Sequence, residues 1–408
     1  MQKRTLSALA SILLCYVCLL TTHAGIVLED GYALPEPDDW TVLSDDSTPS
    51  EGLPVTVRAK SAVLLDQGTG RVLLEKNAHE KCYPASVTKI MAMLLVAEAV
   101  DSGEIRLTDE VTAGADAASK GGSQIWLREG ETMTAAELLK ATAVYSANDA
   151  CTALGEYIAG SSEAFVRQMN ERARELGMTD THFVNCTGLD DDTTEHLTTA
   201  YDVALMSREL LRHAWITEYT TIWMDSLRGG ATQLVNTNKL IRFYDGATGL
   251  KTGTTNKAGC CVAASAKREN THLIAVVLGS DNSKDRFEGA KTLLNWGFAN
   301  FETILPAIDR EKCVPVRVLG GVTEFISPQV PQPPAVLIPK GKAQEVTQTI
   351  ELAADVQAPV EKGQTLGKVT LRFGDETLGT YPLTAGEEVA KLTVPILFRR
   401  LIGVFAAK

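Results

Sequence analysis

The sequence is poor in the residues that metal centres use, and it has no excess of positive charge. It contains only 6 histidines, and its cysteines beyond residue 24 show neither a Cys-x-x-Cys spacing nor a spacing paired with histidine. The formal net charge is -12, which argues against nucleic acid as a partner. Attraction to anionic lipid cannot explain the whole of such a surface. We therefore expect no metal, no cofactor and no nucleic acid.

The sequence also lacks an apolar run long enough to cross a membrane comfortably. The N-terminal apolar run extends from Leu6 to Leu20, whereas a spanning helix needs about 20 residues. Two basic residues precede the run, and Thr22-His23-Ala24 follows it as a small-residue cleavage site. Residues 1–24 are therefore predicted to be a secretory signal peptide, which would make the mature chain exported and extracytoplasmic. A retained membrane anchor is the alternative.

Six cysteines follow the predicted cleavage site, namely Cys82, Cys151, Cys186, Cys260, Cys261 and Cys313. Outside the cell they could form disulfides, but the sequence does not decide any pairing. We interpret most of them as small buried hydrophobic residues. Cys82 has no histidine placed to activate its thiol, so a catalytic cysteine is not expected. The adjacent Cys260 and Cys261 would face opposite sides of a strand.

The composition is that of a globular protein with enough residues for two domains. Hydrophobic residues make up 45% of the 408 residues and charged residues 22%. The predicted divisions are a signal peptide (1–24), a flexible acidic leader (25–54), a first domain (55–305), a small β-rich domain (306–392) and an apolar tail with a basic pair (393–408). No internal repeat is visible.

The first domain is predicted to place helices between two sets of strands. Strands are expected at 61–66, 71–75, 248–254, 259–267 and 273–278, and helices at 87–101, 134–144, from 149, at 163–176, 200–213 and 283–298. Thr134 and Glu137 have the spacing of a capping box. The helix that follows residue 86 is apolar nearly all round, which is typical of a helix buried inside its domain. This order indicates an α+β fold with a mostly antiparallel sheet flanked by helices.

The most informative stretch is Ser86-Val87-Thr88-Lys89, the only Ser-x-x-Lys in the chain. If a helix begins near Ser86, the Ser86 hydroxyl and the Lys89 amine lie on one face, one turn apart. A serine is a weak nucleophile until a base removes its proton, and a lysine can be that base only if its pKa is lowered by burial or by a second cation. The alternative is a solvated serine and lysine at the start of a helix, because the motif also arises by chance.

Two further motifs follow in a fixed order along the chain. Ser146-Ala147-Asn148 lies at a predicted junction between helices. Lys251-Thr252-Gly253 lies on a predicted strand, where Gly253 would let the backbone of a ligand approach closely. Ser280-Asp281-Asn282 is a competing match, but it comes after the Lys-Thr-Gly strand and is interpreted as a structural turn.

Together the three ordered motifs resemble those of the serine acyl-transferases that bind penicillin. The stretches 121–127, 183–190 and 196–202 narrow the resemblance to the low-molecular-mass penicillin-binding proteins that are D-alanyl-D-alanine carboxypeptidases. It extends from about Val57 to the C-terminus. It implies a β-lactamase/DD-peptidase-like catalytic domain, then a small all-β domain and an amphipathic tail. The implied substrate is a peptidoglycan stem peptide ending in D-Ala-D-Ala, and β-lactams would be covalent inhibitors.

The resemblance implies a catalytic role for five residues. Ser86 would be the acylated nucleophile and Lys89 its base. Ser146 would pass protons toward the amine of the leaving D-alanine. Asn148 would hold Lys89 and the substrate amide, and Lys251 would supply the positive field that keeps Lys89 deprotonated.

The resemblance also implies the groups that bind the substrate. Thr252, next to Gly253 and with Arg286 behind it, would bind the terminal carboxylate. Arg286 could instead be a surface residue at the start of a helix. The backbone amides of Ser86 and Thr254 would form an oxyanion hole, whose donors are typically worth about 3 kcal/mol each. Many family members have His at the position of Thr254, so only its backbone role carries over. No dedicated base for the deacylating water is evident.

Two alternative functions stay open at this point. A β-lactamase shares the three motifs but needs a carboxylate-held water, and no Glu-x-x-x-Asn context lies between Ser146 and Lys251. A non-catalytic peptidoglycan-binding protein of the same fold is the other alternative, against which the intact motifs argue. His182 and His196 are interpreted as structural. The run Asp190-Asp191-Asp192 is interpreted as a solvated acidic turn rather than a metal site.

The tail at 393–408 is too short to span a bilayer but could lie in the membrane interface as an amphipathic helix. Such a helix would attach an exported protein peripherally to the outer face of the cytoplasmic membrane. The alternative is a terminal helix or strand that docks on the protein core.

Overall fold

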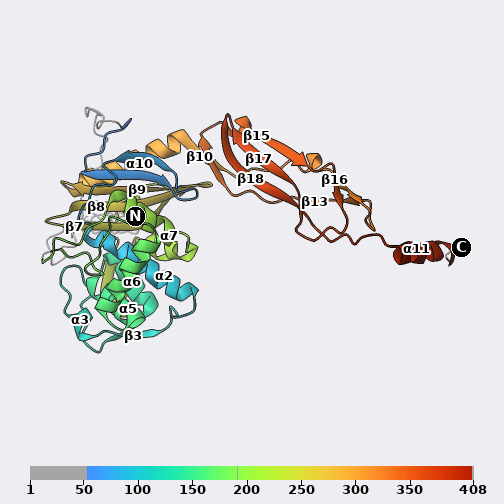
Figure 1. Cartoon of the computed structure of the whole chain (residues 1–408). Helices are drawn as coiled ribbons and strands as arrows, with labels where there is room; N and C mark the ends of the chain where they lie inside the picture. The colour runs from blue at the N-terminus through green and yellow to red at the C-terminus, as the bar shows by residue number, and fades with distance from the viewer. Residues whose placement is uncertain (1–52, 191, 407–408) are drawn as a thin grey trace, which may run out of the picture. The chain divides into compact units, whose positions relative to one another are not determined.

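The computed structural model describes residues 53–190 and 192–406 of the chain. The predicted signal peptide, nearly all of the predicted leader, Asp191 and the last two residues of the tail lie outside the described residues. The described part contains a mixed α+β region, followed by an all-β region and a terminal helix (Figure 1). The predicted α+β region and the small all-β region that follows it are confirmed.

A five-stranded antiparallel sheet organises the α+β region. Its order is β2-β1-β9-β8-β7, formed by β1 (Ser61–Asp66), β2 (Val72–Lys76), β7 (Ala247–Thr255), β8 (Gly259–Arg268) and β9 (Thr271–Ser280). The first hairpin therefore joins the three later strands through β1 and β9, where Val63 lies opposite Val276. All five strands were predicted. Four of them contain runs of apolar residues bounded by turn residues, whereas β7 is rich in Thr and Gly.

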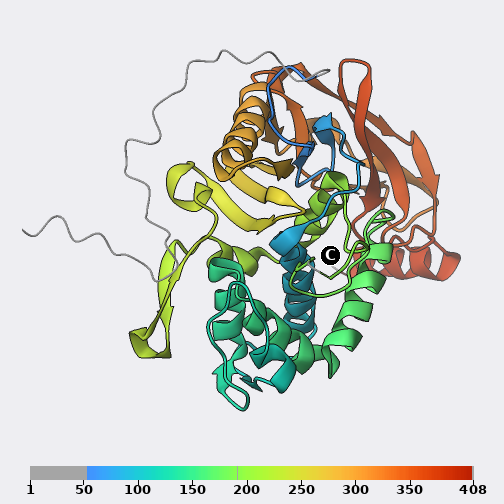
Figure 2. The same cartoon turned by 90° about the vertical axis from the view of Figure 1, so that its left-hand side faces the viewer.

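Helices cover both faces of this sheet (Figures 1 and 2). Because side chains alternate along a strand, Leu64 and Val277 pack with α10 (Ser283–Asn300), whereas Val63 and Val276 belong to the core on the other face. That second core contains α2 (Lys89–Asp101), α5 (Asn148–Ala159), α6 (Ser162–Glu175) and α7 (Ala200–Leu210). The prediction that α2 is buried is confirmed, since its apolar side chains from residue 90 to 94 are 2% exposed or less.

The remaining elements of this region are short. The capping box predicted for α4 (Ala135–Lys140) is present, with the Glu137 amide donating to Thr134 Oγ1 at 3.2 Å. The sequence did not predict the helices α3 (Ala115–Ala118), α8 (Thr217–Thr220) and α9 (Leu240–Phe243), nor the pairs β3 (Glu110–Thr112) with β4 (Thr132–Thr134) and β5 (Met224–Leu227) with β6 (Thr232–Val235). Elements of three or four residues carry too few positions for a periodic pattern to appear.

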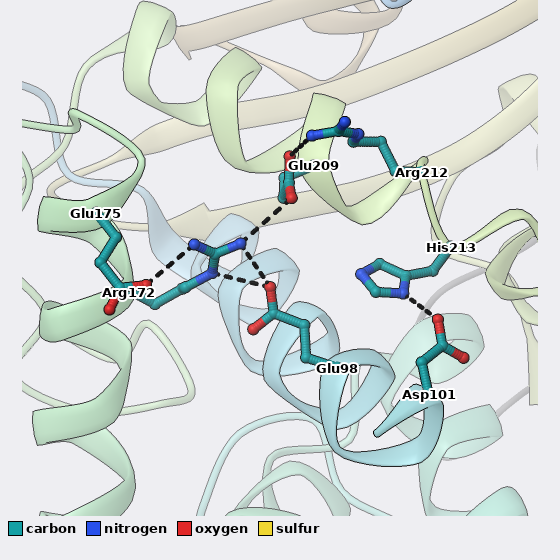
Figure 3. A network of polar contacts seen from close by, with 7 residues as sticks. All are labelled: Glu98, Asp101, Arg172, Glu175, Glu209, Arg212 and His213. Carbon is teal, nitrogen blue, oxygen red and sulfur yellow. Dashed lines mark hydrogen bonds and ion pairs between the residues drawn. The ribbon is translucent and has the colours of Figure 1, made fainter. Parts of the chain in front are cut away.

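The C-terminal end of α2 is held by ion pairs to two other helices (Figure 3). Arg172 of α6 lies 2.7 Å from Glu98 of α2 and 3.2 Å from Glu209 of α7, and it also pairs with Glu175. Nearby, Asp101 accepts hydrogen bonds from the ring nitrogens of His213 and Trp215. These contacts tie the C-terminal turn of α2 to its neighbours.

The all-β region is built from short strands around a small core. β10 (Phe301–Ile304) pairs with β14 (Val336–Pro339), and β11 (Val316–Leu319) lies between β12 (Phe325–Ile326) and β16 (Asp355–Gln357). A four-stranded sheet has the order β13 (Pro328–Gln329), β18 (Glu376–Ala385), β17 (Thr365–Phe373) and β15 (Val346–Leu352). The core residues are Val316, Val318, Ile326, Val360, Leu366, Ala385 and Val389.

The described part of the chain ends in α11 (Val394–Ala406), within the predicted tail. Four of its large apolar side chains are exposed, namely Val394, Leu397, Phe398 and Ile402. Across the described residues we find no helix with both the length and the apolar character required to cross a membrane.

Candidate active site

Ser86 lies in a tight turn that leads directly into α2. Residues Ala85–Thr88 form a 3-10 helix, and α2 begins at Lys89. In a 3-10 helix residues three apart lie directly above one another, so the Ser86 hydroxyl meets the Lys89 amine at 3.0 Å. The turn is otherwise buried, but Ser86 is half exposed. The predicted pairing is present, and the hydroxyl is accessible.

Three contacts hold the backbone of this turn. Ala85 has a φ of 47°, a conformation that costs energy for a residue with a Cβ. Thr88 Oγ1 donates to the Ala85 carbonyl at 2.8 Å and accepts from His196 Nε2 at 2.8 Å. The other ring nitrogen of His196 accepts from the Val184 amide, and burial lowers the pKa of His196 to about 4. The structure thus gives His196 a structural, neutral role, as expected.

Two glycines press against the same turn. A Cβ at Gly253 would lie 2.8 Å from the Ser86 amide nitrogen, and a Cβ at Gly188 would overlap the Ala85 carbonyl. Gly253 was expected to make room for the backbone of a ligand. The structure shows that it first makes room for the backbone of the Ser86 turn itself.

Lys89 is fully buried and has no carboxylate partner among the described residues. Its Nζ lies 3.0 Å from Ser86 Oγ, 2.6 Å from Asn148 Oδ1 and 2.8 Å from the carbonyl oxygen of Thr187. Burial lowers the pKa of Lys89 to about 8. A buried amine with two carbonyl acceptors and a serine hydroxyl is well placed to exchange a proton with that serine.

The Ser146-Ala147-Asn148 motif lies where one helix ends and the next begins. The helix predicted to continue to Val144 ends at Lys140, and a single π-helical turn, Ala141–Tyr145, follows it. Ser146 then adopts φ 68° and ψ 26°, and α5 starts at Asn148. Such π turns and left-handed residues are frequent at functional sites because they re-aim a side chain. Ser146 is buried, but the structure gives its hydroxyl no hydrogen bond to Lys89 or Lys251.

Asn148 connects Lys89 to a neighbouring loop. Its Nδ2 donates to the Gly121 carbonyl at 2.6 Å, and its backbone amide donates to the Ser123 carbonyl at 2.6 Å. The buried carboxylate of Asp149 holds the same loop, because it accepts from the amides of Ile125 and Leu127 at about 3.0 Å. Asp149 was not singled out from the sequence, although its position directly after the motif was visible there.

The Lys-Thr-Gly motif lies on a strand, β7, as predicted, and the structure places this strand at the edge of the sheet. Lys251 is buried, and its Nζ donates to the Thr252 carbonyl at 3.0 Å. Burial, and then the positive charges of Lys89 and Arg286, lower the pKa of Lys251 well below its usual value. For Lys89 the leading cause is burial, so the field of Lys251 is not the main reason that its pKa is low. Two buried amines that repel one another titrate as a pair.

Thr252 and Arg286 have separate partners. Thr252 Oγ1 donates to Thr237 Oγ1 at 2.7 Å. Arg286 Nη1 donates to the Gly253 carbonyl at 3.0 Å and to Thr254 Oγ1 at 2.9 Å. Its guanidinium was expected behind Thr252, but it lies against Thr254. Arg286 is only 8% exposed, so the alternative of a surface residue is wrong.

The charge of Arg286 is not neutralised by a neighbouring group. Within residues 53–190 and 192–406, no carboxylate lies at ion-pair distance from it, and its Nε has no hydrogen-bond partner. An unpaired buried cation beside an edge strand attracts an anion.

Two sequence interpretations outside the three motifs had different outcomes. Asn282 of the Ser-Asp-Asn match is the N-cap of α10, since its Oδ1 accepts from the Asp285 amide at 2.9 Å. Its structural assignment agrees with this geometry. In contrast, Asp190 is not solvated: it is buried and accepts from Thr255 Oγ1 at 2.6 Å, while Lys257 donates to its backbone carbonyl. Tertiary packing against β7 overrides the polar local sequence. Asp191 lies outside the described residues.

The sequence reasoning missed the Thr187 carbonyl and Thr237. A backbone carbonyl has no sequence signature, and Thr187 lies 98 residues from Lys89. Thr237 stands between Asn236 and Asn238, a polar cluster that could have been singled out, but nothing local links it to Thr252.

A surface cavity of about 360 Å³ lies at the opposite end of α2 from Ser86. Its lining includes Glu98, Arg172, Glu175 and Ile158. The first three of these are the charges that already pair with one another, so the cavity does not offer an unpaired group comparable to Lys89 or Arg286.

Comparison with known proteins gives two family matches along the chain. A family model described as D-alanyl-D-alanine carboxypeptidase matches residues 46–282. A second model, described as penicillin-binding protein 5, C-terminal domain, matches residues 301–391.

Individual relatives agree with these matches. The D-alanyl-D-alanine carboxypeptidase DacF of Bacillus subtilis is 43% identical over 350 residues, which cover 85% of this chain and 89% of the relative. The crystal structure of penicillin-binding protein 5 from Haemophilus influenzae has a TM-score of 0.71 and 32% identity, covering 83% of this chain and 99% of that one. Penicillin-binding protein D2 from Listeria monocytogenes in its ampicillin-bound form has a TM-score of 0.55 and 31% identity, covering 59% and 98% of the two chains.

Proposed function

The chain belongs to the D-alanyl-D-alanine carboxypeptidase family, and from this premise we propose that it removes the terminal D-alanine from peptidoglycan pentapeptide through an acyl-enzyme on Ser86. The observation that carries the proposal is the contact between Ser86 Oγ and the buried amine of Lys89. Neither a metal nor an organic cofactor enters it. The names of the relatives favour a carboxypeptidase over a β-lactamase.

Lys89 acts in its neutral form as the base. A neutral amine has two N–H donors and one lone pair, whereas an ammonium has three donors and no lone pair. Asn148 Oδ1 and the Thr187 carbonyl accept the two N–H groups, which leaves the lone pair to face the Ser86 hydroxyl. With a pKa of about 8, about one tenth of Lys89 is neutral at pH 7.

During acylation the Ser86 oxygen attacks the carbonyl carbon of the penultimate D-alanine. Lys89 takes the Ser86 proton, and the negative charge on the carbonyl oxygen is stabilised by the backbone amides of Ser86 and Thr254. The close approach of Gly253 to the Ser86 amide supports this placement of the two donors. Ser146, which is buried, then gives its proton to the nitrogen of the leaving D-alanine and takes the Ser86 proton from Lys89 in exchange, so that Lys89 is neutral again.

The terminal carboxylate of the substrate binds at the exposed edge of β7. Thr252 supplies a hydroxyl, which in this structure donates a hydrogen bond to Thr237. Thr254 supplies a second hydroxyl. Arg286 supplies uncompensated positive charge directly behind them. This arrangement favours a substrate that ends in a free carboxylate, which is the property that distinguishes a carboxypeptidase substrate. Water then hydrolyses the ester, with Lys89 as the nearest base.

β-Lactams would acylate Ser86 in the same way, and the tail would hold the exported protein on the outer face of the cytoplasmic membrane. The exposed apolar side chains of α11 support the second point, because an isolated helix with an apolar face is stabilised at a membrane interface. Deleting residues 394–408 should release the protein from membranes without loss of peptidase activity. Unchanged membrane fractionation of that variant would contradict the proposed attachment.

The decisive experiment measures release of D-alanine from a Lys-D-Ala-D-Ala peptide, together with labelling by a fluorescent penicillin. Wild type should do both and Ser86→Ala neither. Ser280→Ala is a matched control, since it removes a serine from the Ser-Asp-Asn match on β9 and should leave both activities intact. Absence of D-alanine release by wild type, or equal labelling of Ser86→Ala, would refute the proposal. Rapid turnover of nitrocefin would instead indicate a β-lactamase.

A further inference from the structure

Two buried thiols lie next to one another behind Lys89. Cys151 of α5 and Cys186 are 1% and 3% exposed. Cys151 Sγ donates to the backbone carbonyl of Cys186 at 3.4 Å, and Thr152 Oγ1 lies 3.7 Å from Cys186 Sγ. The two cysteines are 35 residues apart in the chain. The catalytic proposal uses neither thiol.

The pair bridges the two segments that hold Lys89. Cys151 lies one helical turn after Asn148, whose Oδ1 accepts from Lys89. Cys186 directly precedes Thr187, whose carbonyl is the other acceptor. Thr152 connects the two sides again, because it donates to the Asn148 carbonyl at 2.9 Å. Any change in the distance between the sulfurs therefore acts on both acceptors of the proposed base.

We propose that Cys151 and Cys186 form a redox modification site that closes to a disulfide in the presence of an oxidant of the disulfide class, and that closure slows acylation of Ser86. The inference rests on the proposed function for its effect on activity, and on the predicted export of the chain for the presence of an oxidant. The formation of the bond itself depends on neither.

The exchange is balanced in two steps. The Cys186 thiolate attacks one sulfur of the oxidant, the disulfide of the oxidant breaks, and one of its sulfurs leaves as a thiolate that takes up a proton. Cys151 then loses its proton and attacks the Cys186 sulfur, which expels the second sulfur of the oxidant as a thiol. The two protein thiols are oxidised to one disulfide, and the oxidant is reduced to two thiols.

The surroundings favour Cys186 as the first nucleophile. The neighbouring Cys151 thiol lowers the pKa of Cys186 despite burial, and the Thr152 hydroxyl and the charge of Lys89 act in the same direction. Cys186 also lies in a segment without helix or strand, whereas Cys151 lies within α5. Local opening of such a segment costs less than unfolding a helix, and it gives an oxidant access to the sulfur.

Closure should displace the acceptors of Lys89. The sulfurs of a disulfide lie about 2 Å apart, closer than those of two separate thiols. Drawing them together moves the Thr187 carbonyl and the start of α5 relative to Lys89 Nζ, and a misplacement of about 1 Å at a catalytic group can cost about 10²-fold in rate. Reduction should restore the original geometry.

The test uses the chain from residue 25 onward, which lacks Cys15 and Cys18, with Cys313→Ser, which removes the one cysteine among the described residues that is not buried. The protein is equilibrated with oxidised or reduced glutathione, and the penicillin-labelling rate and the intact mass are recorded. The result expected is a loss of two hydrogen masses, a peptide cross-linked between Cys151 and Cys186, and labelling slower by about 10²-fold that a reductant restores. Cys151→Ala and Cys186→Ala should each label at a rate that oxidised glutathione does not change. Cys82→Ala is the matched control that keeps the response.

Three results would overturn the inference. Both thiols could stay free to alkylation after oxidation and unfolding, the cross-link could form with no change in labelling, or the alanine variants could be inhibited as strongly as their parent. If the reduced parent is not labelled at all, the proposed function fails, while mass and peptide mapping still decide whether the disulfide forms. Thermal melting of each variant separates misfolding from a specific effect.

Discussion

The first and last turns of α2 both carry charged side chains, but the surroundings of these charges are opposite in kind. At the first turn, Lys89 is fully buried among carbonyl and hydroxyl oxygens, and burial lowers its pKa to about 8. At the last turn, Glu98 pairs with Arg172, and the hydrogen bonds that Arg172 donates to carboxylates outweigh burial and raise the pKa of Arg172. A charge that is paired holds helices together, whereas a charge that is buried and unpaired is ready to lose its proton.

Both ends use long-range partners, so the difference does not come from local sequence. Lys89 meets Asn148 and Thr187 from α5 and a loop, and Glu98 meets Arg172 from α6 (Figure 3). What differs is the chemistry of the partner and its access to water: Glu98 and Arg172 are each more than 20% exposed, and Lys89 is not exposed at all. Removing one charge at each end of α2 tests this difference.

The largest effect is expected for Lys89→Met, which keeps an unbranched side chain but removes the base. General-base catalysis typically contributes about 10²- to 10⁴-fold, so the rate of Ser86 acylation should fall by that amount. Stopped-flow labelling with a fluorescent penicillin would measure it. Lys140→Met is the control, because Lys140 pairs with Asp225 at 2.7 Å away from the motifs, and it should acylate at the wild-type rate. A Lys89→Met protein that acylates normally would remove the proposed base.

The next effect is the dependence of acylation on pH. Only neutral Lys89 can accept the Ser86 proton, and the neutral fraction increases as pH rises toward the pKa of about 8. The acylation rate of wild type should therefore increase about tenfold per pH unit below that value and level off above it. Acylation rates measured with a penicillin between pH 5.5 and 9.5 would show this rise and the plateau above it. A flat profile over this range would mean that the proton acceptor is a different group.

A smaller effect, on stability alone, is expected for Arg172→Met. The variant leaves three carboxylates at the end of α2 without their shared cation, and partly exposed pairs are worth up to about 1 kcal/mol each. The free energy of unfolding should fall by about 1–2 kcal/mol, while penicillin labelling of the folded protein stays unchanged. Urea unfolding followed by circular dichroism gives the first quantity. Loss of labelling without loss of stability would show that the two ends of α2 are coupled.

The smallest effect is expected for Asp101→Asn. Hydrogen bonds from His213 and Trp215 lower the pKa of Asp101, so its contribution to stability is present above the usual pKa of an aspartate and is lost as pH falls through the lowered value. The carboxylate is 47% exposed, and solvent limits the contribution to less than about 1 kcal/mol. Melting temperatures of wild type and variant should differ at pH 7, and the difference should shrink as the pH is lowered below the usual pKa of an aspartate. A difference that stays the same at low pH would rule out an ionic contribution.

Most regular elements of the catalytic region were predictable, because each is long enough to show a pattern. The strands β1, β8 and β9 are apolar runs, and α10 follows an N-cap at Asn282. The junction before Ser146 was not predictable, since a π turn and a left-handed serine follow no propensity rule. The short pairs β3–β4 and β5–β6 were missed for lack of length.

In the candidate site, too, some features were predictable from the sequence and others were not. The spacing of Ser86 and Lys89 was enough to predict that they meet, because a single helical turn connects them. The burial of Arg286 and of Asp190 was not predictable, since both residues are polar and lie where the local sequence indicates a surface. Their burial depends on how β7 packs against other segments, which no short stretch encodes.

By itself, the sequence determined which chemical groups are present, the order of the three motifs, and the local geometry that spans a few residues. Only the tertiary structure decided the charge state of those groups, because Lys89 takes its acceptors from positions 59 and 98 residues away and its pKa from the water that the surrounding core excludes. It likewise decided that the thiol of Cys151 lies against the backbone of Cys186. The physical reason is that hydrogen-bond geometry within one turn is a local property, whereas desolvation is the sum of contacts from the whole domain.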